Sequence, residues 1–450
     1  MGHLGKILLL ICCIIGELLL QTAFRAQFGP FVSPLLHFIF SIGSGIILLN
    51  IGKNNRGLKI NKPIDCTIST DQKITKIGWL RLALVPLTML IIAFFLNRLF
   101  LKHPINMMNP GLSGSDVIPQ IMFFVTRAVS GQYPYQPITG PLWGYTLTPT
   151  YMPFQWIPYI PAQLLHFEYR WIPVIILFLA LMSFLYKVEK SKLSSTSKWL
   201  VLLTPITILI CYYKFNLDES INTVEVLVAS YYLFLGLALT SKKTLLIAGT
   251  IVLCLLSRYA IVLWLPLFFL IYLSQNGIKQ TLKIGLFVFL GVLVFYGPFL
   301  WKDPLIFIKG YEYYNLATPN EWTVKPWQPT GSYPIHLERG LGFAIYFYKY
   351  SGGVIESGIR YLKMTHLTLL LSLITFLSIY YWRNKNRIYP VIFAVASLKI
   401  YLTFFYSFIQ IPYSYLYILP LLFDVPVLYF ALLHYKNQKE QVNHPLLTNT

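Results

Sequence analysis

Charged side chains between apolar segments are the first candidates for chemistry in this sequence of 450 residues. Arg258 separates two apolar runs, and its planar set of N–H donors could bind a phosphate. It could equally be an interfacial arginine that extends toward the lipid headgroups. Asp218 and Glu219 lie together in a short polar loop and could bind sugar hydroxyls or a divalent cation. A solvated turn explains this pair equally well, because adjacent residues on a helix do not face one another.

A second polar group lies in the long segment 301–361. His336, Glu338 and Arg339 follow one another closely there, among Trp and Tyr residues, amides and further acids. This composition is typical of a pocket for sugar and phosphate rather than of a plain connection. A single histidine in such a segment is more often a surface residue, so the prediction of a pocket depends on His336, Glu338 and Arg339 together.

The segment 115–131 has the features of a short helix that lies along the membrane surface. Ser115 is a suitable N-cap, Pro119 falls in the first turn, and Gly131 supplies a C-terminal stop. Asp116 then lies at the N-terminus, where the helix dipole keeps its carboxylate ionised. The apolar residues that recur at helical spacing are Val117, Ile118, Ile121, Met122, Val125 and Val129.

Proline and aromatic residues dominate the segment 131–167 that follows. Proline at this density excludes a regular membrane span, and Tyr and Trp favour the interface. Tyr133, Tyr135 and Tyr151 could each bind the apolar face of a sugar ring, or could belong to an interfacial aromatic belt.

The elements that must position these residues are membrane helices. Of the residues, 56% are apolar or aromatic and 12% are charged, and the mean hydropathy is +0.61. These values exclude a water-soluble enzyme and a disordered chain. The sequence predicts an all-α polytopic membrane protein with about twelve transmembrane helices, the first of them a span rather than a signal peptide. The spans are expected at 7–24, 35–51, 79–101, 171–186, 199–213, 224–240, 244–258, 259–273, 284–300, 362–381, 389–409 and 412–433.

The net charge of +20 is best explained by the orientation of these spans. With the N-terminus inside, the inner segments hold 21 of the 36 basic residues and 4 acidic ones, so the inner face carries +17. A nucleic-acid partner is therefore not expected, and the partner is the lipid bilayer of the plasma (inner) membrane. In this topology the two long loops, 102–170 and 301–361, both face the extracytoplasmic side.

The spans and loops suggest five parts of the chain. Residues 1–78 form an accessory transmembrane hairpin with a cytoplasmic linker, and 79–300 form the main module that carries the loop 102–170. The other parts are the second outer loop at 301–361, the C-terminal transmembrane helices at 362–433 and a cytoplasmic tail at 434–450.

Two ionisable residues within predicted spans form an expected pair. Lys399 and Asp424 lie 12 and 13 residues from the turn near Ile411. They are thus at similar depths, where charged residues are usually paired. We expect them to face each other as a structural ion pair. Glu17, also within a span, has no obvious partner.

The order of motifs resembles a known family. A span is followed by Ser115-Asp116 opening an interfacial helix, then by Gly131-x-Tyr133-Pro134-Tyr135, then by Tyr151-x-Pro153 leading into a second short helix. This order resembles the GT-C superfamily of polyprenyl-phosphate-sugar-dependent glycosyltransferases, in its bacterial mannosyltransferase-like branch. The resemblance covers 79–300 well and 301–433 loosely.

The resemblance implies transfer of a sugar from a polyprenyl-phosphate donor to a glycan or glycolipid acceptor on the outer face. No clear DxD motif appears, so neither a metal nor a cofactor is expected. Asp116 would be the general base, and a single base with direct displacement implies inversion. Arg258 and Arg339 would bind the donor phosphate. Mannose is the favoured sugar, although the Gly-Gln pair of that branch is absent. The residues implied to bind the sugar or the acceptor are Tyr133, Tyr135, Tyr151, Asp218, Glu219, His336 and Glu338.

Two other classes of function remain open. A transporter or a flippase for lipid-linked oligosaccharides would use paired charges at membrane depth, for which Lys399 and Asp424 are the only indication. A polysaccharide polymerase also has large outer loops, but usually with paired arginine-rich sequences. Convergence of Asp116, Arg258 and His336 on one outer site would favour glycosyl transfer.

Overall fold

The structure is a computed structural model, and its regular elements are helices in the part of the chain that it describes. An isolated bridge pairs Lys53 with Ile388. In the hydrocarbon core a helix satisfies every backbone N–H and C=O group within itself, which explains why apolar segments of this length fold as helices. The described residues are 2–25, 27–53, 73–107, 115–139, 146, 148, 150–217, 221–241, 243–324 and 333–443.

Nine helical stretches in the described ranges are long and apolar enough to cross a membrane, which confirms a polytopic helical membrane protein. They are α1 (His3–Gln21), α2 (Gly29–Ile51), α3 (Lys76–Lys102), α7 (Trp171–Lys190), α8 (Ser195–Phe215), η3 (Tyr259–Trp264) continuing into α12 (Leu265–Lys302), α16 (Ile355–Asn384), α17 (Pro390–Ser407), and η4 (Ser414–Tyr417) continuing through α18 (Ile418–Leu422) into α19 (Asp424–Asn443).

Twelve spans remain a prediction, for two reasons. The expected spans 224–240 and 244–258 are the shorter helices α10 (Glu225–Ala238) and α11 (Thr244–Leu255). The expected spans 259–273 and 284–300 belong to one stretch of 44 residues from η3 through α12, in which Gly277 has φ +74° and breaks the helical geometry. A positive φ is open to glycine because it lacks a Cβ atom.

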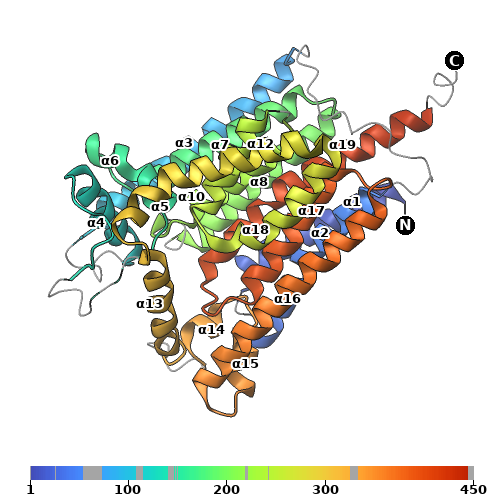
Figure 1. The fold of residues 1–450 in the computed structure, drawn as a ribbon. Helices are drawn as coiled ribbons and strands as arrows, with labels where there is room; N and C mark the ends of the chain where they lie inside the picture. The colour runs from blue at the N-terminus through green and yellow to red at the C-terminus, as the bar shows by residue number, and fades with distance from the viewer. Residues whose placement is uncertain are drawn as a thin grey trace.

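The remaining helices are short and gather at one end of the bundle. These are α4 (Val117–Val129), α5 (Pro153–Trp156), η2 (Ile157–Tyr159), α6 (Ile160–Leu164), α13 (Ile306–Glu321), α14 (Ile335–Arg339) and α15 (Ala344–Tyr350). Figure 1 shows both groups, α4–α6 and α13–α15, at the end of the bundle away from the N- and C-termini. We call this the loop end. The two long loops thus share one end, as the sequence predicts.

The N-terminal helix pair is packed into the bundle. Helix α2 packs against α1, α17 and α19, and a Cβ atom added at Gly45 would lie 2.6 Å from a side-chain atom of Ile400. Segments from opposite ends of the chain therefore share one core. Whether this pair is accessory to the activity stays a prediction.

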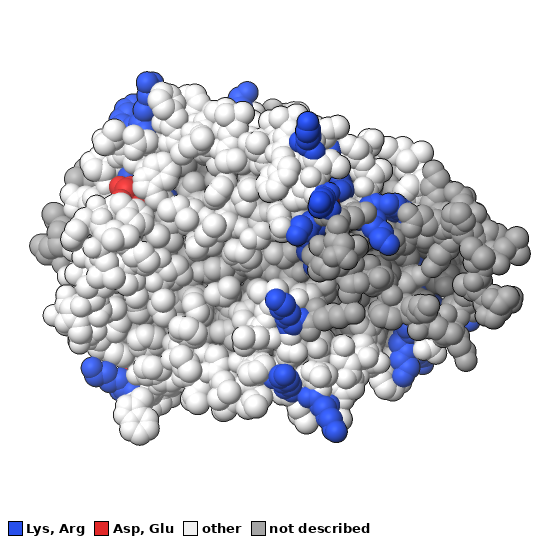
Figure 2. All heavy atoms as spheres, turned by 90° about the horizontal axis from the view of Figure 1, so that it is seen from above, with Lys and Arg blue, Asp and Glu red and all other residues white. Residues whose placement is uncertain are grey.

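The bundle surface has the charge distribution of a membrane protein. Figure 2 shows a wide zone without charged side chains, with most of the basic side chains of that face toward the end that carries the termini. Large apolar side chains are exposed on α3, α12 and α16, as expected of surfaces that face lipid tails. Examples are Leu90, Phe95, Leu282, Phe289, Val294 and Phe376.

Candidate functional site

Asp116 occupies the N-terminus of α4. It is the N-cap residue, and its side chain makes no capping hydrogen bond; Ser115, expected at that position, lies one residue earlier and its Oγ accepts from the backbone N–H of Val117 at 3.2 Å. The Gln120 side-chain amide donates to Asp116 Oδ2 at 3.0 Å. The carboxylate is half-buried and lies at the N-terminal, positive end of the helix dipole.

Helix α4 packs through nearly the apolar face that the spacing of its residues predicts. The buried face is rotated slightly around the helix axis. Ile121, Phe124 and Val125 are fully buried, whereas Val129 is 42% exposed. The ring of Phe124 stacks on Trp156 of α5 at 5.8 Å between centroids. Gly131 follows with φ +70° and ends the helix as predicted. This packing fixes the position of Asp116.

The three tyrosines of the first loop have different environments. Tyr135 is 2% exposed, and its hydroxyl accepts from Trp156 Nε1 at 3.1 Å, so it is a core residue rather than one that faces a sugar. The Tyr133 hydroxyl donates to the carbonyl oxygen of Phe299 at 3.2 Å. Tyr151 is half-buried and lies within electrostatic reach of Tyr413. Of the three, Tyr151 is the one placed beside the polar groups described next.

Arg258 lies between α11 and η3 and forms an ion pair with Glu225, in the first turn of α10. Its side chain is 26% exposed, whereas that of Glu225 is 1% exposed. A buried carboxylate that binds a partly exposed arginine holds the guanidinium in one orientation. Glu225 was not predicted from the sequence. The sequence feature that points to it is an acidic residue at the start of an otherwise apolar helix, just after a polar loop.

His336 lies on the short helix α14. Its Nε2 is 3.2 Å from Glu321 Oε2, at the end of α13, and its ring packs against that of Tyr413 with 4.6 Å between centroids. The neighbouring Trp322 donates from Nε1 to the carbonyl oxygen of Gln410 at 2.9 Å. The second long loop is thus tied to the turn between α17 and η4.

Tyr413 and Tyr415 connect the two loops. Their rings are stacked, with 5.2 Å between centroids and an interplanar angle of 9°; we call them the tyrosine pair. Burial raises the pKa of Tyr413 well above its ordinary value, and Glu321, Tyr314, Asp116 and Tyr151 raise it further. Its hydroxyl therefore stays protonated, as a donor, over the physiological pH range.

Asp116 and Arg258 both lie within electrostatic reach of Tyr415. Burial raises the pKa of Tyr314, on α13, while Arg258 lowers it. His336 contacts Tyr413, so three predicted site residues from separate segments either contact the tyrosine pair or lie within electrostatic reach of it. They are Asp116, Arg258 and His336.

The other predicted residues are less well placed or lie outside the described chain. Arg339 is exposed, and Glu338 is half-buried. The Oε2 atom of Glu338 is buried and has no hydrogen-bond partner in the described part of the chain. Asp218 and Glu219 lie outside the described residues. Within the described ranges, no three His, Cys, Asp or Glu side chains are grouped so that they could hold a metal ion.

The expected pair of Lys399 and Asp424 is confirmed, with Nζ and Oδ1 3.0 Å apart. The expectation that Glu17 lacks a partner is wrong, because its Oε2 is 2.8 Å from the same Nζ. The two acids reach Lys399 from different helices, α1 and α19.

Gly340 sets the position of α14 over the turn between α17 and η4. A Cβ atom there would lie 2.3 Å from the carbonyl oxygen of Pro412 and 2.5 Å from that of His336. We expect Gly340→Ala to push His336 away from Tyr413 and to destabilise the fold by about 1–3 kcal/mol, the usual cost of overpacking. Thermal unfolding in detergent measures this effect. Gly249→Ala is the control, since no atom lies within 4 Å of that Cβ position; equal melting temperatures for the two variants would contradict the prediction.

Comparison of the chain with models of known protein families, with curated proteins and with solved structures finds no match. Arguments about function therefore rest on the residues and geometry of this chain.

Proposed function

We propose that this protein is an integral membrane glycosyltransferase that moves a sugar, mannose-like by preference, from a polyprenyl-phosphate donor to a glycan or glycolipid acceptor. The observation that carries the proposal is that an acidic residue, Asp116, and a basic residue, Arg258, both lie within electrostatic reach of Tyr415 at the loop end. The reaction needs both a proton acceptor and a phosphate-binding cation at the membrane surface.

Asp116 is the general base in this proposal. Its carboxylate removes the proton from the acceptor hydroxyl as that oxygen attacks the anomeric carbon, and the bond from that carbon to the phosphate oxygen breaks. The electron pair leaves with the polyprenyl phosphate, and the sugar inverts its configuration. The Gln120 side-chain amide donates to Oδ2 and so orients the carboxylate.

Arg258 binds the phosphate. Its Nη2 is held by Glu225 Oε1, while the Nε of Arg258 and the Oε2 of Glu225 are buried and have no hydrogen-bond partner in the described ranges. Unmet hydrogen bonds on buried polar groups are costly. Arg258 Nε needs an acceptor such as a phosphate oxygen, whereas Glu225 Oε2 needs a donor such as a sugar hydroxyl group. A phosphate oxygen accepting from the guanidinium would also stabilise the charge of the leaving group.

Aromatic side chains supply the sugar-binding surface. In this proposal the sugar lies against Tyr151, the tyrosine pair and the ring of His336, because the flat faces of aromatic rings suit the apolar faces of sugars. The isoprenoid part of the donor needs lipid while its sugar needs water. A site at the end of a membrane bundle meets both requirements.

The proposal is tested with the purified full-length protein in lipid vesicles. Labelled polyprenyl-phosphate sugars are supplied one at a time with a membrane glycolipid extract as acceptor. The expected result is transfer of label from one of these donors to the acceptor, with equimolar release of polyprenyl phosphate. Label that stays on the donor lipid for every sugar tested would contradict the proposal.

Arg258→Gln is expected to weaken donor use. Loss of a charge-assisted hydrogen bond to phosphate costs about 1.5–3 kcal/mol, which corresponds to an increase of roughly 10- to 150-fold in the donor KM. Arg98→Gln is the control, because Arg98 is exposed at the loop end of α3 and packs over Phe94. A donor KM that rises equally in both variants would assign the effect to general surface charge.

A transporter or flippase of lipid-linked sugars is the second candidate. The observation that favours it is the charged cluster of Glu17, Lys399 and Asp424 inside the bundle, since charged groups at membrane depth are common in transport proteins. The same vesicles distinguish the two functions. A flippase would move the labelled lipid across the bilayer without transferring its sugar.

A further inference from the structure

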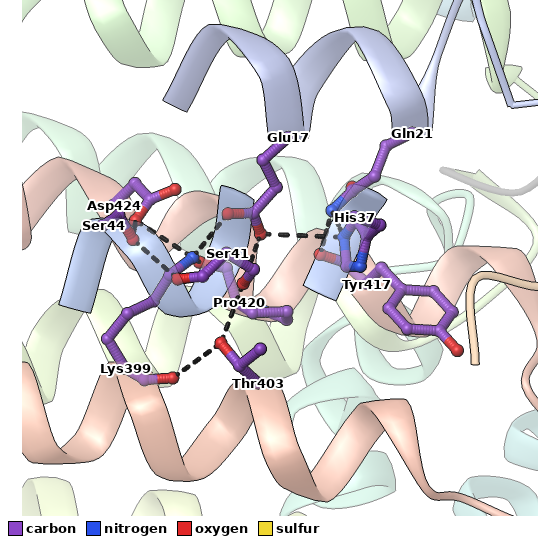
Figure 3. A network of polar contacts seen from close by, with 10 residues as sticks. All are labelled: Glu17, Gln21, His37, Ser41, Ser44, Lys399, Thr403, Tyr417, Pro420 and Asp424. Atoms are coloured by element: carbon purple, nitrogen blue, oxygen red, sulfur yellow. Dashed lines mark hydrogen bonds and ion pairs between the residues drawn. The ribbon is translucent and has the colours of Figure 1, made fainter. Parts of the chain in front are cut away.

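Three ionisable side chains from three helices meet in the interior of the bundle (Figure 3). Lys399 Nζ is 2.8 Å from Glu17 Oε2 and 3.0 Å from Asp424 Oδ1, and all three side chains are 0% exposed. A buried charge without a counter-charge is very costly. The protonation state of each group can therefore be derived from its contacts.

Lys399 is a charged ammonium group. Its Nζ has three acceptors, which are Glu17 Oε2 at 2.8 Å, Asp424 Oδ1 at 3.0 Å and the carbonyl oxygen of Pro420 at 2.8 Å. An ammonium group has three N–H donors, one for each contact, whereas a neutral amine has two. The cluster therefore contains one positive charge beside two carboxyl groups.

His37 on α2 does not supply the second positive charge. Its Nε2 is 3.8 Å from Glu17 Oε1 and 3.1 Å from the side-chain nitrogen of Gln21. That nitrogen donates to the carbonyl oxygen of Tyr417 at 2.9 Å, so it is an amide NH₂ group and can only donate. His37 Nε2 must then accept, and the imidazole is neutral.

The other titratable groups that face the cluster are also neutral. Cys13 on α1 lies within electrostatic reach of Glu17 and Asp424, and a buried thiol is uncharged at neutral pH. The ring of Tyr417, in η4, packs against His37 with 5.0 Å between centroids, and a phenol is uncharged at this pH. Two ionised carboxylates would thus leave one negative charge without compensation.

A chain of hydroxyl groups shows where the compensating proton belongs. Glu17 Oε1 is 3.1 Å from Ser41 Oγ, which is 2.8 Å from Thr403 Oγ1, which is 2.9 Å from the carbonyl oxygen of Lys399. These three contacts need three hydrogens, and the two hydroxyl groups supply two. A proton on Glu17 Oε1 supplies the third, while Oε2 still accepts from Lys399.

Asp424 is less suited to hold that proton. Its Oδ1 lies 3.0 Å from Lys399 Nζ and 2.9 Å from Ser44 Oγ, whose one hydrogen can also go to the carbonyl oxygen of Ser41 at 2.9 Å. A proton on Oδ1 would put a hydroxyl hydrogen on the oxygen that accepts from the Lys399 ammonium group, whereas a proton on Glu17 Oε1 leaves Oε2 for Lys399. The Oδ2 atom of Asp424 has no hydrogen-bond partner in the part of the chain that the structure describes. A proton on Oδ2 would have no acceptor there.

We propose that this cluster is a proton-binding site at membrane depth, in which Glu17 holds one proton on Oε1 beside the ion pair of Lys399 and Asp424. The site is independent of the proposed glycosyl transfer. Because its atoms are buried between α1, α2, α17 and α19, exchange of this proton with water requires these helices to separate.

Infrared spectroscopy of the purified full-length protein at neutral pH tests the proposal through the carbonyl stretch of protonated carboxyl groups. Carbon-13 labelling of the glutamate carboxyl groups should shift one such band, and carbon-13 labelling of aspartate should leave it in place. No variant is needed for this measurement. A band that shifts with labelled aspartate, or no band at all, would overturn the assignment to Glu17.

Single substitutions give an independent pattern. Glu17→Gln should remove the band, and Asp424→Asn should also remove it, because Glu17 then becomes the sole counter-ion of Lys399. Lys399→Gln should double the protonated-carboxyl signal, since no cation remains. His37→Gln is the control and should leave the band unchanged; a larger band in this variant would show that His37 carries the second positive charge.

Discussion

Asp116→Asn is expected to lower the rate of sugar transfer by about 10²–10⁴-fold, the usual contribution of a general base. The amide has nearly the shape of the carboxylate but cannot accept the proton of the acceptor hydroxyl. Since the Asp116 side chain makes no capping hydrogen bond to α4, the helix should remain folded. Initial rates with saturating donor and acceptor measure the effect, and the melting temperature in detergent checks the fold.

Asp303→Asn is the matched control for this variant. Asp303 also lies at the loop end, where it binds the exposed Lys309 with 2.7 Å between Oδ2 and Nζ. Its removal should leave the transfer rate within about twofold, because exposed ion pairs contribute little. If Asp116→Asn retained the wild-type rate, Asp116 could not be the base. If the two variants lost activity equally, the loss would reflect the charge of the loop end as a whole.

Lys399→Gln is expected to have the largest effect on stability, a loss of about 3–5 kcal/mol, as measured when one partner of a buried ion pair is removed. The substitution removes the only positive charge beside Glu17 and Asp424, so both carboxyl groups must be neutral in the folded protein. Keeping a carboxyl group neutral costs about 1.4 kcal/mol for each pH unit above the pH at which a free carboxyl group titrates. The loss of stability in Lys399→Gln, relative to the wild type, should therefore become smaller as the pH falls from 7 toward 5.

Denaturant unfolding in mixed micelles at several pH values measures the difference in the free energy of unfolding between Lys399→Gln and the wild type. Lys309→Gln is the control, since Lys309 also binds a carboxylate at 2.7 Å but its side chain is 51% exposed. Its loss should cost at most about 1 kcal/mol at every pH. A Lys399→Gln variant as stable as Lys309→Gln would show that the buried cluster contributes nothing to the fold.

The membrane helices are well predicted from the sequence because a long apolar run has one stable conformation in lipid. Counting residues from the turn near Ile411 is enough to predict that Lys399 faces Asp424. The same counting fails for Glu17, because no turn links α1 to α17 and their contact depends on how distant segments pack. Helices α10 and α11 are shorter than their apolar runs, since an apolar run does not show where a helix ends.

The candidate site could be predicted only in part. Residue types single out Asp116, Arg258 and His336, and the topology places their loops at one end. Which tyrosines face that site depends on tertiary packing. Tyr135 is buried among aromatic rings, while Tyr413 and Tyr415, in a segment that reads as part of a span, lie between the two loops. Glu225 was missed because an acidic residue at the start of an apolar helix does not by itself show that Arg258, 33 residues later in the chain, contacts it.

An experimental structure of the full-length protein with a non-transferable polyprenyl-phosphate sugar bound tests the proposed site most directly. The proposed function predicts a phosphate oxygen within about 3 Å of the Arg258 guanidinium. It also predicts the sugar against the tyrosine pair and the anomeric carbon on the side of Asp116. A donor bound elsewhere, for example with its phosphate in the hollow lined by Arg360 and Lys363 between α13 and α16, would contradict it.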